Sequence, residues 1–222
     1  MDVVNEFCDL LQSHVNRDKV VSLASYLLKL WGSSAERKDL MTASAKLSAA
    51  RAATRLFDDA TALKTWVAYG LGKQDGPIWG PIGVANSVFS LLYLQAEKVM
   101  FLIDVGIIVV SKDVDFRVRT AHKLFWSLSA FVGFIRSIRA LHSKAKVLKS
   151  PQRTKCAPAQ YRQACMTSTK LILDVIHAVS WLPPGWLWGG ALSAKKASAV
   201  ASVSAVLALI IHYNGKRLAS SK

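Results

Sequence analysis

The chain carries few residues whose types and spacing could perform chemistry. Glu97 and Asp104 lie on one face of a predicted helix and could form a carboxylate pair, but Lys98 and Arg119 are equally good salt-bridge partners for them. There is no Gly-x-Ser-x-Gly elbow, phosphate-binding glycine loop, His-Glu-x-x-His or paired-cysteine motif. The five histidines are widely scattered and are more typical of satisfied polar residues than of metal ligands: His14, His122, His142, His177 and His212. We therefore predict a protein that is not an enzyme and that uses no metal or cofactor.

The cysteines indicate the redox compartment. The three of them, Cys8, Cys156 and Cys165, include no Cys-x-x-Cys spacing, and their odd number makes a disulfide framework improbable. We interpret them as thiols in a reducing compartment. The acidic N-terminus is also unlike a secretory signal, which begins with basic residues and continues into an apolar run.

Charge and hydropathy together narrow the class of partner. The chain has 29 Lys and Arg against 14 Asp and Glu, so its net charge is +15, yet 52% of its residues are hydrophobic and its mean hydropathy is +0.27. A strong positive charge suits a nucleic acid or an anionic lipid surface. The high hydropathy favours the lipid surface, and we predict an anionic phospholipid membrane, not a nucleic acid, as the partner.

The positive charge is concentrated between Arg117 and Lys170, where twelve Lys or Arg occur without an Asp or Glu. Its densest part comprises Lys144, Lys146, Lys149, Arg153 and Lys155. This stretch could be a solvated helix face, or a polybasic segment beside a membrane, worth about 1 kcal/mol per residue near an anionic leaflet. A soluble nucleic-acid binder would explain the charge but not the apolar segment at residues 197–213.

Hydrophobic periodicity predicts an all-α fold, a bundle of about six to seven amphipathic and membrane-embedded helices. We divide it into an N-terminal amphipathic region (1–72), central apolar and basic helices (73–150) and C-terminal helices (151–222). The expected helices cover residues 2–14, a segment capped by Asn16 or Asp18 and ending at Gly32, then 38–67, 84–110, a helix starting at Asp113, and 159–180. The glycines and prolines of residues 70–83 predict a loop.

Two segments carry the membrane prediction. Residues 38–67 contain no Gly or Pro and should form one continuous amphipathic helix, either packed on a partner, with Arg55 paired to Asp58 and Asp59, or lying on a bilayer. Residues 197–213 carry no formal charge, and we predict a membrane segment near 191–213, flanked by Lys195, Lys196, Lys216 and Arg217. Ala197, Ala201 and Ala205 repeat every four residues, a spacing that lets membrane helices approach closely. Residues 84–110 are interrupted by charges, which favours a protein-packed or interfacial helix.

Several motifs, spread in order over most of the chain, resemble the peroxin-11 family of peroxisomal membrane proteins. They are the run that begins Asn16-Arg17-Asp18-Lys19-Val20, residues 47–59, and Tyr69-Gly70-Leu71-Gly72. Glu97-Lys98-Val99 followed by Asp104, and residues 177–190, are most similar to the gamma branch of that family.

The resemblance implies a protein of the peroxisomal membrane that promotes elongation, proliferation and division of the organelle. It implies that an N-terminal amphipathic helix inserts into the cytosolic leaflet, and that homo-oligomers recruit a fission adaptor and a dynamin-related GTPase. An alternative function is a channel for small metabolites, with Glu97, Lys98 and Asp104 inside. The candidate membrane-contact residues implied by the resemblance are Met41, Lys46, Arg51, Arg55, Leu56, Leu63, Lys64 and Val67.

The stripe of residues 38–67 is mostly Ala, which predicts shallow insertion, because an Ala-rich face buries little apolar surface. The same face suits packing against a neighbouring helix. We therefore expect this helix to be docked within the folded protein at rest, with Leu56 and Leu63 buried, and to engage lipid from that state.

Overall fold

The computed structural model describes residue 8 and residues 11–151 and 154–220. Within them the chain forms seven α-helices, one short 3-10 helix and no strand, which confirms the all-α prediction. The elements are α2 (His14–Ser34), α3 (Lys38–Thr54), α4 (Asp58–Tyr69), η1 (Lys73–Asp75), α5 (Gly76–Asp104), α6 (Lys112–Lys149), α7 (Ala157–Ser180) and α8 (Ala194–Ser220). The helix predicted over residues 2–14 falls largely outside the described residues.

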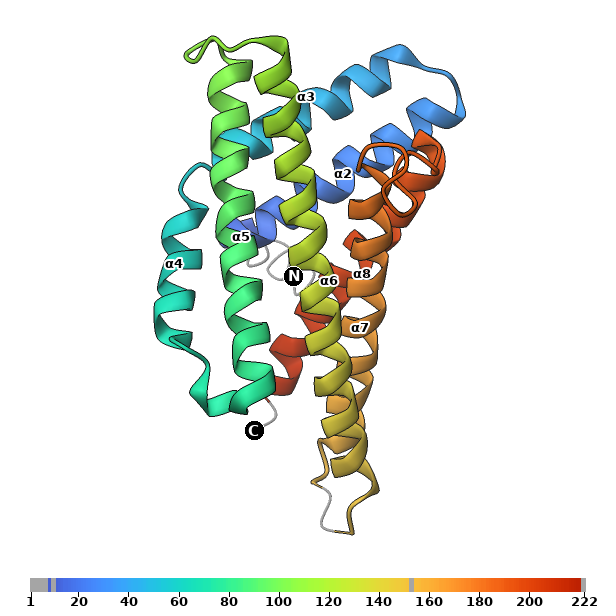
Figure 1. Cartoon of the computed structure of the whole chain (residues 1–222). Helices are drawn as coiled ribbons and strands as arrows, with labels where there is room; N and C mark the ends of the chain where they lie inside the picture. The colour runs from blue at the N-terminus through green and yellow to red at the C-terminus, as the bar shows by residue number, and fades with distance from the viewer. Residues whose placement is uncertain (1–7, 9–10, 152–153, 221–222) are drawn as a thin grey trace.

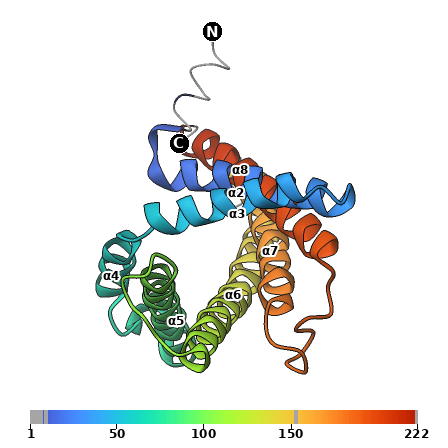
Figure 2. The ribbon, with the colours of Figure 1, turned by 90° about the horizontal axis from the view of Figure 1, so that it is seen from above.

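Six of the helices form a closed ring. Helix α5 packs on α6, α6 on α7, α7 on α8, α8 on α2 and α2 on α3, and α3 returns to contact α5. Helix α4 packs on α5 outside this ring, as the view from above shows (Figure 2). The long helices α5, α6 and α7 lie side by side, whereas α2 and α3 run across them (Figure 1). Residues from both ends of the chain therefore meet around one central space.

The best-packed part of the molecule is the interface of α6 with α7. Val175, Ala178 and Val179 of α7 are almost fully buried, and Ala130 of α6 and Leu182 complete the core. Ala197, Ala201 and Ala205 of α8 are 5%, 2% and 8% exposed. Their small side chains permit the close approach of α8 to α2 and α7.

The prediction of one helix over residues 38–67 is wrong, because the helix breaks at Arg55–Phe57. The backbone of Arg55 (φ −91°, ψ 2°) and of Phe57 (φ −110°, ψ 6°) leaves the helical region. Helix α3 packs on α2 and α4 on α5, so the chain must change direction between them. Asp58 and Asp59 occupy the first turn of α4, where acidic side chains stabilise the positive end of a helix.

The loop predicted over residues 70–83 is also wrong, since α5 already begins at Gly76. Pro77 lies in the first turn, where a missing N–H costs nothing, and Pro81 is accommodated one turn later. A Cβ on Gly80 would clash with the carbonyl oxygen of Gly72, so these glycines allow the turn to touch the helix. The Tyr69 hydroxyl donates to Asp75 at 2.6 Å and fixes the same turn.

Two smaller expectations also change. Helix α2 starts at His14, ahead of the predicted caps: Asn16 and Asp18 lie inside the helix, where their side chains contact His212 and Arg51. Residues 191–193 of the predicted membrane segment precede the last helix, which starts at Ala194. The helix predicted from Asp113 is confirmed by α6, which the Ser111 hydroxyl caps by accepting from the backbone N–H of Val114 at 3.4 Å.

Candidate functional site

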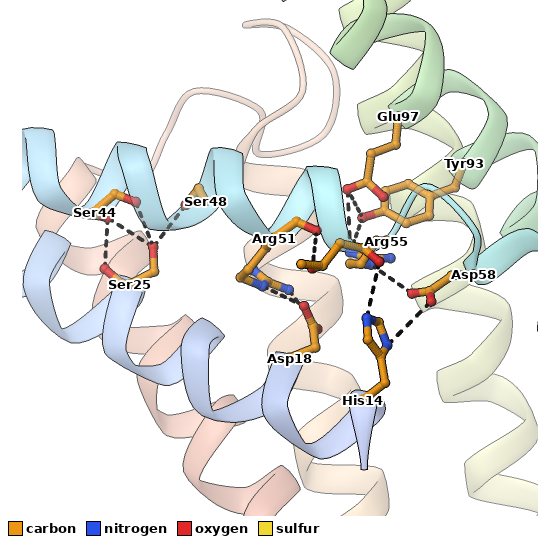
Figure 3. Close-up of polar contacts among 11 residues, drawn as sticks. His14, Asp18, Ser25, Ser44, Ser48, Arg51, Arg55, Asp58, Tyr93 and Glu97 are labelled. Atoms are coloured by element: carbon orange, nitrogen blue, oxygen red, sulfur yellow. Dashed lines mark hydrogen bonds and ion pairs between the residues drawn. The ribbon is translucent and has the colours of Figure 1, made fainter. Parts of the chain in front are cut away.

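Helix α3 is docked on α2 through polar groups. The Ser25 hydroxyl, 1% exposed, lies 3.1 Å from the Ser44 hydroxyl and 2.9 Å from that of Ser48, and Ser44 in turn donates to the Ser25 carbonyl at 2.8 Å (Figure 3). These three serines fill the crossing of the two helices with small groups whose hydrogen bonds are satisfied. The face of α3 that meets α2 is therefore not the alanine stripe that periodicity predicted.

An ion-pair cluster lies at the end of this crossing, and we define it as Asp18, Arg51, Arg55, Asp58 and Glu97 (Figure 3). Arg51 donates two hydrogen bonds to the Asp18 carboxylate, at 2.9 and 3.0 Å, in a bidentate pair. Burial disfavours the charged form of Arg51, but the hydrogen bonds and charge of Asp18 outweigh it, so the pKa of Arg51 is raised. Helix α3 is thus tied to α2 by charge as well as by serines.

Arg55 is the centre of the cluster. Its guanidinium lies 3.1 Å from the Tyr93 hydroxyl, 3.4 Å from Glu97 and 3.4 Å from Asp58, and its side chain is only 17% exposed. Burial again opposes its charge, but Tyr93 and Glu97 outweigh this effect and raise the pKa of Arg55. The pairing with Asp58 confirms one predicted partner. The other, Asp59, instead binds Lys98 of α5 at 2.5 Å.

The segment after Arg55 exposes apolar side chains. Phe57, in the turn between α3 and α4, is 82% exposed, Val67 is 72% exposed and Leu63 is 48% exposed. The expectation that Leu63 is buried is therefore wrong, because α4 turns Ala62, Trp66 and Tyr69 toward its neighbours instead. Of the other predicted membrane-contact residues, Lys46 and Lys64 are exposed, and Met41 and Leu56 are half-buried.

A polar cavity of about 490 Å³ occupies the centre of the ring. All helices from α2 to α8 contribute to its wall, which includes the ion-pair cluster and Tyr93, together with His14, Lys19, Ser22, Tyr26, His122, Trp126, Lys170, Asp174, His177 and Ser204. Its volume lies in the range of small-molecule sites. Of the residues proposed to line a channel, Glu97 borders this cavity, whereas Lys98 and Asp104 do not.

In the part of the chain that the structure describes, three helices are long and apolar enough to cross a membrane: residues 73–104, 112–149 and 194–218. In each, at most 28% of the most apolar window is buried within the protein. The predicted C-terminal segment is the third of these helices. The charges that argued against a membrane span in the first helix, residues 73–104, are paired. Glu97 binds Arg55, Lys98 binds Asp59, and Asp104 binds Arg119 at 2.5 Å. Pairing lowers the cost of charge in such helices.

The predicted basic residues mark the ends of these helices. Lys144 donates to Gln160 at 3.0 Å, and Lys146, Lys149 and Lys155 are exposed around the α6–α7 turn, whereas Arg153 lies outside the described residues. Lys195 and Lys196 are exposed at the start of α8, and Lys216 and Arg217 near its end. The described residues contain no group of His, Cys, Asp or Glu arranged to hold a metal ion.

Sequence reasoning missed several residues that dock α3 on α2 or line the cavity. Asp18 was assigned as a cap, Ser25 and Ser44 were not singled out, and Tyr93 was passed over. One signal was present: the adjacent acids Asp58 and Asp59 after Leu56-Phe57 are typical of a helix start and could have located the break.

Comparisons with known proteins show which family the sequence matches. The family model described as Peroxisomal biogenesis factor 11 matches residues 4–211. Two relatives named Peroxisomal membrane protein 11C are each 26% identical to this chain: one from Mus musculus, with 93% of both chains covered, and one from Homo sapiens, with 90% of both covered. No solved structure matches the chain.

Proposed function

The chain belongs to the Peroxisomal biogenesis factor 11 family, the peroxin-11 family, and is a protein of the peroxisomal membrane; on this premise we propose that it promotes membrane elongation and division by inserting α4 and the α3–α4 turn into the cytosolic leaflet. In this proposal the protein acts mechanically and not as an enzyme. The observation that carries it is the exposed apolar group Phe57, Leu63 and Val67, which lies beside the exposed Lys64. A helix that lies in the membrane interface typically combines apolar side chains with adjacent cationic ones.

The ion-pair cluster defines the resting state of the protein before insertion. Arg51 and Arg55 carry charges suited to lipid phosphates, but in the folded chain they form ion pairs with Asp18, Asp58 and Glu97. An anionic bilayer offers phosphate oxygens in place of these carboxylates. Lipid and protein therefore compete for the two arginines, and weakening the protein partners should favour the membrane-bound form.

The experiment changes the carboxylates and leaves the arginines available to lipid. Full-length protein carrying Asp18→Asn or Glu97→Gln is added to anionic liposomes, and the fraction of tubulated vesicles is measured by electron microscopy against the protein-to-lipid ratio. We expect both variants to tubulate at a ratio several-fold lower than the unmodified chain. The matched control is Asp113→Asn, because Asp113 pairs with Arg117 at the surface, with side chains 67% and 77% exposed.

A second pair of variants tests the inserting residues themselves. Phe57→Ser and Val67→Ser remove exposed apolar groups and should raise the ratio needed for tubulation, while Val109→Ser, at a 92% exposed residue in the α5–α6 loop, should leave it unchanged. Tubulation that is insensitive to both Phe57→Ser and Val67→Ser would contradict the assignment of α4 as the inserting element.

The proposal extends to assembly. We propose that the protein forms homo-oligomers through the exposed faces of its three apolar helices and then recruits a fission adaptor and a dynamin-related GTPase, as the family resemblance implies. The low burial of those helices supports self-association, since their apolar surface needs lipid or another protein as a neighbour. Cross-linking of detergent-solubilised protein over a hundredfold concentration range should show concentration-dependent dimers or larger species.

A metabolite channel is the second candidate function, and the central polar cavity is the observation that favours it. Buried charged groups within a membrane-embedded bundle are typical of solute pathways. Planar-bilayer recordings separate the two functions. Protein that tubulates liposomes but shows no conductance supports remodelling alone, whereas conductance by the purified unmodified protein would support the channel.

A further inference from the structure

The charged residues of the cavity wall are not all ion-paired. Arg51 binds Asp18 of α2, and Arg55 binds Asp58 and Glu97. On α7, Lys170 binds Asp174. Among the described residues of the wall, one positive charge remains without a carboxylate bound to it.

That charge belongs to Lys19. Its ammonium group donates to the Asn16 side chain at 3.3 Å, but no carboxylate lies within ion-pair distance of it in the described residues. Lys170, the neighbouring cation, is already bound by Asp174, which also accepts from the Ser204 hydroxyl. Burial and the positive charge of Lys170 lower the pKa of Lys19. A partly buried ammonium beside a second cation is stabilised by an anion between them.

Further polar groups lie on the same wall. Lys19 and Ser22 are three residues apart on one face of α2, and Lys170, Asp174 and His177 follow one face of α7. The Ser22 side chain is 8% exposed and borders the cavity. His177 is 5% exposed, and its Nδ1 has no partner. A buried polar group without a partner is rare in folded proteins, and a bound ligand is one explanation for it.

We propose that the α2–α7–α8 side of the cavity binds a phosphate group, held by the Lys19 ammonium and the Ser22 hydroxyl, with Lys170 adding long-range attraction. A phosphate offers several acceptor oxygens around one centre, which matches donors that approach from different helices, whereas a carboxylate presents only two in one plane. The cavity volume of about 490 Å³ leaves room for the remainder of a small phosphate ester or a phospholipid headgroup. This site does not depend on the proposed membrane remodelling, which uses α4 and the α3–α4 turn.

The experiment is isothermal titration calorimetry on the purified full-length protein in a neutral detergent. Three probes are compared at one ionic strength: glycerol 3-phosphate, short-chain dihexanoyl phosphatidic acid, and acetate. The variants are Lys19→Gln and Ser22→Ala, and the matched control is Lys112→Gln, an exposed lysine at the start of α6 that does not border the cavity.

We expect saturable binding of at least one phosphate probe, with a dissociation constant that rises about tenfold in Lys19→Gln. It should rise severalfold in Ser22→Ala and stay unchanged in Lys112→Gln. Equal affinity for the two phosphate probes identifies the phosphate group itself as the ligand, and tighter binding of phosphatidic acid identifies a lipid source. Absence of binding by both phosphate probes, acetate binding of equal strength, or an equal response of Lys19→Gln and Lys112→Gln would overturn the proposal.

A second measurement needs no ligand. Because Lys19 lies beside Lys170 without a carboxylate of its own, removing its charge should relieve repulsion in the empty cavity. Thermal unfolding of ligand-free Lys19→Gln should therefore occur at or above the temperature of the unmodified protein, and a phosphate probe should raise that temperature for the unmodified protein only. A marked loss of stability in ligand-free Lys19→Gln would assign Lys19 a structural role instead.

Discussion

Replacing Arg55 with methionine should destabilise the protein more than any other single change in the ion-pair cluster. Methionine keeps the length and apolar stem of the side chain but removes all three polar contacts. Glu97, whose side chain is 16% exposed, then retains only the Tyr93 hydroxyl at 3.2 Å. Leaving one partner of a buried ion pair uncompensated costs 3–5 kcal/mol. Since both side chains keep some exposure, we take the lower end, about 3 kcal/mol.

The double variant separates electrostatics from packing. Arg55→Met with Glu97→Gln removes the stranded charge, so it should recover at least half of the loss. Thermal unfolding in detergent, followed by circular dichroism, should show the single variant lower by about 6–12 °C, at about 2–4 °C per kcal/mol for a chain of this size. Lys46→Met, at an exposed lysine of α3, is the control and should stay within about 0.5 kcal/mol of the unmodified chain. A single variant that loses less than about 1 kcal/mol, or a double variant no more stable than the single one, would refute the reasoning.

Two further predictions concern the helices around the cavity. Ala201→Leu adds three carbons to a side chain that is 2% exposed where α8 packs within the bundle, and this overpacking should cost about 1–3 kcal/mol. Chemical denaturation should show the lower free energy of unfolding. The control Val203→Leu, at a 52% exposed residue, should leave that free energy unchanged. Burial, with a smaller effect of Lys29, lowers the pKa of His177 from 6.5 to about 4, and Asp174 opposes this shift. The unfolded chain therefore binds a proton at His177 more tightly than the folded chain does. The free energy of unfolding is unaffected by this group above pH 6.5, and it falls by about 3 kcal/mol as the pH drops toward 4. Unfolding temperatures measured from pH 7.5 to 4.5 should decline less steeply in His177→Gln than in the unmodified protein.

Local patterns in the sequence were sufficient for the regular parts of this fold. Helix α7 was predicted within two residues at its start, because its apolar residues recur at helical spacing and Pro183-Pro184 ends it. The alanine repeat of α8 predicted close packing, and Ala197, Ala201 and Ala205 are buried. These features depend on residues within a few turns of one another, and this is the range over which periodicity carries information.

The break at Arg55–Phe57 has one local signal, the adjacent acids Asp58 and Asp59, but hydrophobic periodicity does not predict it. Its cause lies 38 and 42 residues away, in Tyr93 and Glu97, which hold the Arg55 side chain at the point where α3 leaves α2. The alanine-rich composition on both sides favours an uninterrupted helix, so tertiary contacts override local propensity here. The ring closure that creates the cavity has the same origin, since it depends on α3 returning to α5.

The break also decides how much of the docked structure must open for α4 to meet lipid. Phe57, Leu63 and Val67 expose 82%, 48% and 72% of their surface while Arg51 and the serines still hold α3 on α2. Full burial of such side chains is worth about 1.5–3 kcal/mol each, so transferring the exposed fractions into a leaflet should gain about 3–6 kcal/mol in total. This gain equals or exceeds the cost of about 3 kcal/mol estimated for disrupting the Arg55 contacts. These side chains can therefore meet the leaflet while α3 stays on α2, and deeper insertion separates Arg55 from Glu97. Glu97→Gln should therefore lower the tubulation threshold more than Asp18→Asn. The reverse order would show that undocking of α3 is the limiting step.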